Sequence, residues 1–185
     1  MELVKAIEKE VKRRCDKESN VFGAGSWTYH IKPVVDNGII LAKRYNADLE
    51  VVTLAALLHD IASVTNEKYY EEHHIIGAEI ADELLSDLRY PRNRIEHVKK
   101  CILNHRGSKV AAKLSIEEVC VADADAIAHF YNIPSLFSLV YKERSMGIEE
   151  GSLFVKKKLE RSYNKLSEES KEFYKEKYEE SMSTF

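Results

Sequence analysis

The chain has 185 residues, of which 44% are apolar and 32% are charged, and its formal net charge is −3. This length lies within the usual size of one domain, and the apolar fraction is enough for a sizeable core. The charge balance lacks the basic excess of proteins that bind nucleic acid or acidic lipid over a broad face, so a nucleic-acid partner is not expected. We therefore expect a single domain over residues 1–185.

The first residues and the cysteines indicate a cellular compartment. The start, MELVKAIEKEVKRR, carries a charge every second or third residue and lacks the apolar centre of a signal peptide. No apolar run approaches the roughly 20 residues that are needed to span a bilayer. Cys15, Cys101 and Cys120 are odd in number and show no CxxC spacing, which fits thiols kept reduced. The sequence predicts a cytoplasmic protein with no membrane partner.

Apolar residues recur at three- and four-residue steps almost throughout, and glycine and proline are scarce, so we predict an all-α fold. The stretch LEVVTLAALLHDIA is apolar on every side and is expected to be the central buried helix. The predicted helices cover about residues 2–17, the segment from the end of a 19–27 loop through His30 to Tyr45, and residues 49–62, 73–88, 92–105, 115–131 and 134–147.

Local residues set the expected helix ends. Asn46 and Asp48 supply turn and cap chemistry before the central helix, and Ser115 with two following glutamates caps a later one. Pro91 ends the 73–88 helix and Gly107 ends the next. The charged tail from 149 to 180 predicts an amphipathic helix that packs on the domain or on a second subunit, which leaves room for a homodimer.

His59 and Asp60 stand side by side in the apolar stretch LAALLHDIA. A carboxylate inside an apolar helix costs several kcal/mol unless it is paired, hydrogen-bonded or bound to a metal. No lysine or arginine on this predicted helix offers a partner. The pair therefore indicates a metal site, and the alternative is the exposed end of a helix.

Further histidines and carboxylates lie on other predicted helices. His30, His74 and His105 each lie on a helix or at its end, and Asp123 and Asp125 interrupt the apolar run VCVADADAIA. These side chains can converge only in a bundle. Two imidazoles and two carboxylates neutralise a divalent ion and leave positions for water and a phosphate oxygen.

The order of these residues, from about Trp27 to Phe130, resembles the HD-domain superfamily of metal-dependent phosphohydrolases. The resemblance implies an HD-domain helical bundle with a core of about 27–132 and additional N-terminal and C-terminal helices, the latter over 149–185. It implies that the metal is bound by His30, His59, Asp60 and Asp125. His74, in HIIGAEIA, and His105, in ILNHRGSK, match histidines that members use for a second ion or for phosphate contacts.

The choice between Asp123 and Asp125 stays open on the sequence alone. Asp123 and Asp125 lie about 200° apart on a helix, so both cannot face one ion. Periodicity places Asp123 on the buried face, whereas the motif register favours Asp125 as the ligand and leaves Asp123 as a catalytic or substrate group.

The histidines expected outside the metal site, solvated or satisfied in the core, are His73, His97 and His129.

Basic residues near the expected site are candidates for substrate phosphate binding. Arg106 and Lys109 follow His105, and Lys32 lies close to His30. The alternative for the first two is a pair of cations that interact with a helix C-terminus.

The resemblance implies divalent-metal-dependent hydrolysis of a phosphate ester or anhydride in a nucleotide or related small metabolite. Asp60 or Asp123 is then expected to position or deprotonate a metal-bound water. Mn, Fe, Co, Ni, Zn and Mg all suit such ligands, with one or two ions per chain. The alternatives are a non-catalytic metal-bound ligand sensor or scaffold, an oxygenase that uses iron, and a metal-free helical interaction module.

Overall fold

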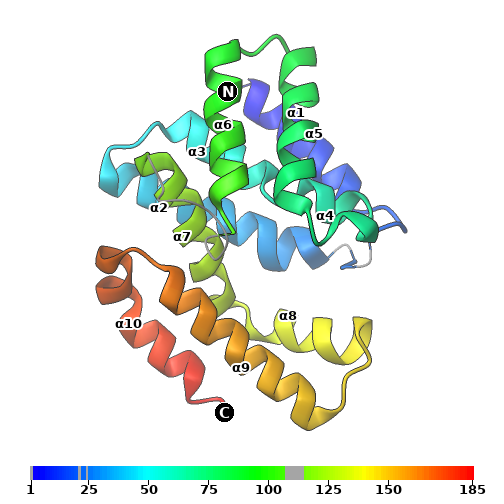
Figure 1. Cartoon of the computed structure of the whole chain (residues 1–185), viewed down its shortest axis with the longest axis vertical. Helices are drawn as coiled ribbons and strands as arrows, with labels where there is room; N and C mark the ends of the chain where they lie inside the picture. The colour runs from blue at the N-terminus through cyan, green and yellow to red at the C-terminus, as the bar shows by residue number, and fades with distance from the viewer. Residues whose placement is uncertain (1, 21, 24, 107–114) are drawn as a thin grey trace.

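The structure is a computed structural model that describes residues 2–20, 22–23, 25–106 and 115–185. Across these residues it is all-helical and contains no strand, which confirms the predicted fold class (Figure 1). The elements in chain order are α1 (Glu2–Cys15), η1 (Trp27–Ile31), α2 (Lys32–Tyr45), α3 (Leu49–Leu58), α4 (Ile61–Thr65), η2 (Glu67–Tyr69), α5 (His73–Asp87), α6 (Arg92–Asn104), α7 (Ile116–Tyr131), α8 (Ile133–Ser138), η3 (Leu139–Glu143), α9 (Ile148–Lys165) and α10 (Glu168–Met182).

Two apolar helices form the centre of the fold. Residues 51–58 of α3 are all buried, and so are residues 120–130 of α7. Helix α7 packs against α2, α3 and α6 on one side and against α9 and α10 on the other. The burial of α3 confirms the prediction that LEVVTLAALL is the central helix, since a helix that is apolar all round needs neighbours on every face.

The predicted caps begin two of these helices. Asp48 accepts hydrogen bonds from the backbone N–H groups of Glu50 and Val51, and Ser115 accepts one from Glu118. Arg94 of α6 also contacts the Asp48 carboxylate at 2.9 Å, so the cap of α3 ties two helices together. Caps of this kind satisfy backbone donors that the first turn leaves without a partner.

Several helix boundaries differ from the prediction. Helix α3 stops at Leu58, and α4 begins only at Ile61, so the predicted 49–62 helix is broken at His59 and Asp60. The predicted tail helix is two helices that meet at Leu166 and Ser167. Gly107, the predicted helix stop, lies outside the described residues.

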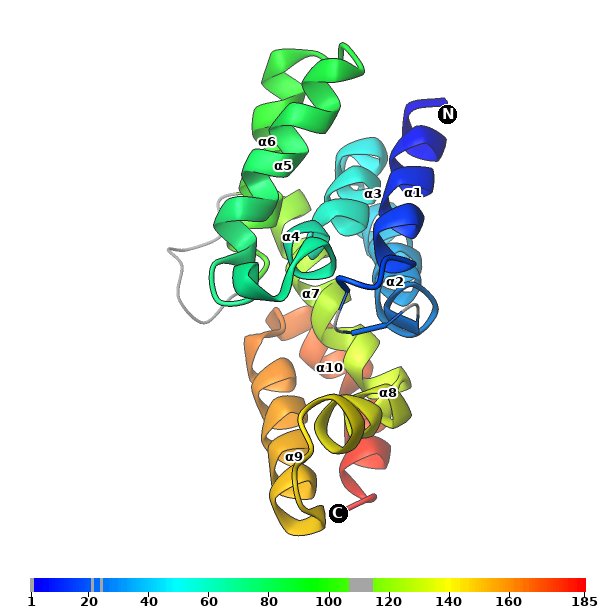
Figure 2. The same cartoon turned by 90° about the vertical axis from the view of Figure 1, so that its right-hand side faces the viewer.

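Helix α7 lies between two groups of helices. Figure 2 shows α5 and α6 together at one end of the molecule and α8, α9 and α10 at the other, with α7 between them. The three cysteines are free, as the sequence predicts, and all three are buried. In the described chain, no helix combines the length and the apolar character that crossing a membrane requires.

Candidate metal centre

The break between α3 and α4 brings His59 and Asp60 to one point. In an unbroken helix these neighbours would point about 100° apart. Asp60 instead has φ −110° and ψ 16°, outside the helical region, and its Oδ2 lies 3.5 Å from His59 Nε2. The break therefore removes the geometric objection to a shared ion.

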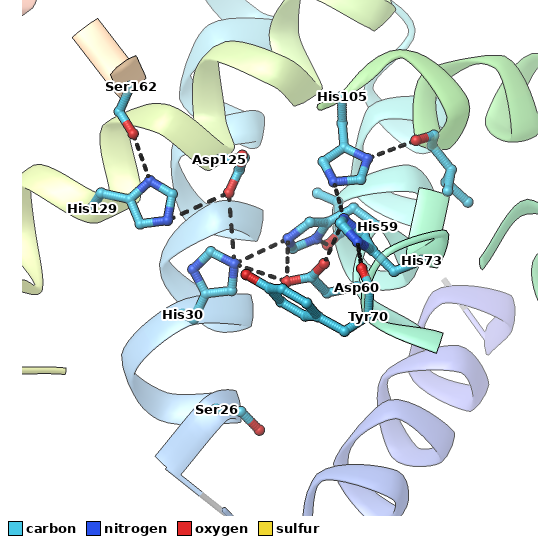
Figure 3. Close-up of polar contacts among 12 residues, drawn as sticks. Ser26, His30, His59, Asp60, Tyr70, His73, His105, Asp125, His129 and Ser162 are labelled. Carbon is cyan, nitrogen blue, oxygen red and sulfur yellow. Dashed lines mark hydrogen bonds and ion pairs between the residues drawn. The ribbon is translucent and has the colours of Figure 1, made fainter. Parts of the chain in front are cut away.

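His30 joins this pair from η1, a π-helical turn that precedes α2. Its Nε2 lies 3.2 Å from Asp60 Oδ2, 3.2 Å from His59 Nε2 and 3.6 Å from Asp125 Oδ1 of α7. Figure 3 shows the four side chains pointing toward one another. Short π-helical segments occur frequently at functional sites. The structure thus brings together His30, His59, Asp60 and Asp125.

A second group of ligands lies on the other side of Asp60. His73 Nε2 is 3.4 Å from Asp60 Oδ1 and 3.2 Å from His105 Nε2 (Figure 3). The two carboxylate oxygens of Asp60 therefore face different histidines. Such a carboxylate can contact two ions at once.

His73 occupies the place that the sequence assigns to His74. His73 is buried at the first residue of α5, so the prediction that it is solvated is wrong. His74, one residue further, is rotated by about 100° and is not among the ligand atoms that cluster within 4.8 Å. Sequence reasoning had no signal for this, because the choice depends on where α5 begins.

Backbone carbonyls fix the protonation of three rings. Nδ1 of His59, His73 and His105 lies 2.8, 2.6 and 2.6 Å from the carbonyl oxygen three residues earlier. A carbonyl oxygen only accepts, so each Nδ1 carries a proton, and Nε2 is the ring atom left to bind a metal. The Nε2 atoms of His73 and His105 lie 3.2 Å apart. Both rings therefore turn their metal-binding atoms toward the same point.

The electrostatics of the cluster favour neutral imidazoles and ionised carboxylates. Burial lowers the pKa of His59, and it lowers the pKa of His105 to about 3. Burial opposes ionisation of Asp60, yet the electrostatic interaction with His59 and the hydrogen bond from His30 hold its pKa well below the usual range. These are the protonation states in which histidine and aspartate bind a metal.

Asp123 lies away from this cluster. Its carboxylate accepts hydrogen bonds from the Ser167 hydroxyl at 2.5 Å and from the Ser167 backbone N–H at 3.2 Å, at the junction of α9 and α10. Asp125, about 200° further round α7, faces the histidines. The structure therefore does not bring Asp123 together with the histidine cluster.

His129 lies beside the cluster, contrary to the prediction that places it outside. Its Nε2 is 3.9 Å from Asp125 Oδ1, its ring stacks on His30, and its Nδ1 is 3.1 Å from the Ser162 hydroxyl of α9 (Figure 3). Burial and the nearby Lys158 ammonium hold the pKa of His129 well below its usual range. The i, i+4 spacing of Asp125 and His129 was a usable signal, since such residues share a helix face.

Helix α9 also contributes basic side chains that sequence reasoning missed. Lys165 Nζ lies 2.5 Å from Asp125 Oδ2 and 3.4 Å from the His105 carbonyl oxygen. Burial opposes ionisation of Asp125, and this ammonium is the main reason that its pKa lies well below the usual range. Lys158 is half-buried, and burial lowers its pKa. The tail therefore places two lysines beside the candidate metal centre.

The predicted phosphate ligands have other neighbours. Lys32 pairs with Asp36 at 2.5 Å and its side chain is 49% exposed. Arg106 donates to the Glu71 backbone carbonyl and lies 3.6 Å from the Glu71 carboxylate. Lys109 lies outside the described residues.

The ligand atoms fall into three overlapping groups that could hold a metal ion. Within each group all ligand atoms lie within 4.8 Å of one another. The groups, among the described residues, are His30 with His59 and Asp60, His30 with Asp125 and His129, and Asp60 with His73 and His105. His97, as predicted, lies elsewhere, with its Nε2 3.2 Å from Glu117.

Parts of this sequence are similar to known proteins. An alignment over 138 positions, which covers 71% of this chain, shows 28% identity to a tRNA (cytidine(56)-2'-O)-methyltransferase from Thermoplasma volcanium, and the chain spans only 40% of that protein. An uncharacterized protein from Clostridium beijerinckii is 37% identical over 60 residues, which cover 32% of this chain and 38% of that protein.

Two solved structures share the fold. Bacillus subtilis YpgQ, solved in complex with ADP, superposes with a TM-score of 0.67 at 20% identity, over 95% of this chain and 90% of that one. A predicted HD superfamily hydrolase from an uncultured Thermotogales bacterium has a TM-score of 0.60 at 24% identity, over 83% of each chain. The sequence profile of the HD domain family matches residues 28–129, more than half of the chain. The chain belongs to the HD domain family.

Proposed function

We propose that this protein is a divalent-metal-dependent phosphohydrolase that acts on a nucleotide or a related small phosphate ester or anhydride. The observation that carries the proposal is the convergence of His73 and His105, whose Nε2 atoms lie 3.2 Å apart beside the Asp60 carboxylate while their Nδ1 atoms donate to backbone carbonyls. Two imidazole nitrogens and a carboxylate oxygen at one point are the donor set of a metal site.

The residues divide between two neighbouring positions. His30, His59, Asp60 and Asp125 are the set for a first ion, and Asp60, His73 and His105 are the set for a second. When bound, a divalent ion lowers the pKa of a coordinated water and polarises a phosphoryl oxygen. The hydrogen bonds from Nδ1 to backbone carbonyls hold the rings in one orientation, so the donor atoms need little rearrangement.

We assign to Asp60 the role of orienting the attacking water. Its carboxylate is ionised at neutral pH and lies at the middle of the cluster, so it can accept a hydrogen bond from that water and orient it. His129, held by Ser162, keeps the Asp125 carboxylate in place from the α9 side.

The comparisons support a nucleotide substrate without fixing its identity. YpgQ was solved with ADP, and the Thermotogales protein is named a predicted hydrolase. Both are less than 25% identical to this chain, so the chemistry rests on the site. The methyltransferase activity belongs to a protein of which this chain covers 40%.

The test is metal content together with turnover in the same preparations. We expect one or two ions per wild-type chain by elemental analysis and phosphate or pyrophosphate release from a nucleotide panel with Mn²⁺. Asp60→Ala should lose at least one ion and all turnover. Asp36→Ala, which removes an exposed carboxylate that pairs with Lys32, should keep both. Metal without turnover would indicate a ligand sensor, and absence of metal from the wild type would refute the proposal.

A further inference from the structure

Three residues of α9 line the metal centre from outside the region that the family profile matches. Lys158, Ser162 and Lys165 follow i, i+4, i+7 spacing and so share one helix face. Ser162 contacts His129 and Lys165 contacts Asp125, so this face is turned toward the site. Figures 1 and 2 show α9 alongside the C-terminal half of α7.

Lys165 stands in the position of a ligand-binding cation. Its side chain is only 15% exposed, and its ammonium lies between Asp125 Oδ2 of α7 and the His105 carbonyl oxygen at the end of α6. An ammonium has three N–H donors, of which these two acceptors use two. The third can be donated to an oxygen of a bound molecule.

The negative charge of a phosphate chain gives a reason for basic side chains on this face of α9. A phosphate chain carries several negative charges, and enzymes that bind one supply basic side chains beside the metal. Lys32 and Arg106 already interact with Asp36 and Glu71. Lys165 and Lys158 instead interact electrostatically with the metal-site carboxylate Asp125.

We propose that Lys165, assisted by Lys158, forms the phosphate-binding subsite of this centre and binds the charged oxygens of the substrate's phosphate chain. The proposal rests on the proposed function for its substrate class. It assigns to α9 a part in substrate binding rather than in packing alone. The competing explanation is a structural ion pair between Lys165 and Asp125 that fastens α9 to α7, and such buried pairs are often replaceable by apolar residues without loss of stability.

Binding of a non-hydrolysable probe separates the two explanations. The full chain is loaded with Mn²⁺ and titrated calorimetrically with methylenediphosphonate, whose P–C–P bridge cannot be hydrolysed. We expect Lys165→Met to weaken binding by about ten- to hundredfold, as for loss of one charge-assisted hydrogen bond. Lys165→Arg, which keeps the charge, should recover part of the affinity, and Lys158→Met should show a smaller loss.

The matched control is Lys157→Met, which makes the same change at an exposed position of α9. It should bind the probe as the wild type does, and metal content should be equal in all variants. The proposal is wrong if the wild type does not bind the probe, if Lys165→Met binds it normally, or if that variant loses the metal instead.

Nucleotide turnover distinguishes this proposal from the proposed function. Lysine-dependent probe binding without turnover would refute hydrolysis and keep the subsite. Turnover with an unchanged KM in Lys165→Met would refute the subsite and keep hydrolysis.

Discussion

Substitutions of the neighbouring residues His73 and His74 should differ in their effect on metal binding. His73 Nε2 faces both Asp60 and His105, whereas His74 contributes no atom to the ligand clusters. We expect His73→Ala to bind one ion fewer per chain than the wild type, because it removes one of three donors of the second group. His74→Ala should keep the wild-type stoichiometry. Elemental analysis of both proteins, purified side by side, checks this, and equal metal loss in the two variants would contradict the geometry.

At the residue scale, the identities of the motif residues were easier to predict than their arrangement in space. The identities His30, His59, Asp60, Asp125 and His105 follow from the ordered resemblance. Their convergence depends on a broken helix and on a π-helical turn, neither of which apolar periodicity can reveal. A functional site is where local pattern and final structure are expected to disagree.

At the scale of elements, α1 is fastened to α4 through a charged contact that should depend on pH. Arg14 donates to Glu10 at 2.8 Å and to the Thr65 hydroxyl of α4 at 2.8 Å. The hydrogen bond from Arg13, opposed by burial and assisted by Arg14, lowers the pKa of Glu10 to about 2. The unfolded chain has a glutamate pKa of about 4.3, so the folded state favours the ionised form.

The sign of this linkage is that Glu10 stabilises the fold fully above about pH 4.3 and loses its contribution as the pH falls toward 2. We expect Glu10→Gln to lower the free energy of unfolding at pH 7 by up to about 1 kcal/mol, the upper end of the contribution of ion pairs near the surface. Urea denaturation of both proteins at pH 7, 4 and 3 measures the difference. A difference that stays constant over this range would assign the effect to packing rather than charge.

Helices were predicted well where apolar pattern and caps agree, as in α3 with Asp48 and α7 with Ser115. The C-terminal region was predicted less well because its charges outnumber its apolar positions. The turn at Leu166 and Ser167 is specified by a long-range contact, the Ser167 hydrogen bonds to Asp123, which no local pattern contains.

At the scale of the whole molecule, two carboxylates of α7 that lie two residues apart contact two different regions. Asp125 faces the histidines of the candidate metal centre, while Asp123, on the opposite side, accepts hydrogen bonds at the junction of α9 and α10. Helix α10 is also anchored at its far end, where the Ser181 hydroxyl donates to the Phe130 carbonyl at 3.0 Å. The position of Lys165 beside Asp125 therefore depends on a junction fixed two residues away by Asp123.

Replacing Asp123 should weaken the fold without removing a metal ligand. Asp123→Ala leaves the half-buried Ser167 donors without their acceptor, at a cost of about 1–3 kcal/mol. We expect urea denaturation of the metal-free protein to show this loss, with the ion stoichiometry of the loaded variant unchanged. Asp125→Ala is the matched control on the same helix and should lower the stoichiometry. Loss of an ion in Asp123→Ala at unchanged stability would instead return Asp123 to the metal centre, whereas the expected result would show that the two carboxylates of one motif have separate structural and ligand roles.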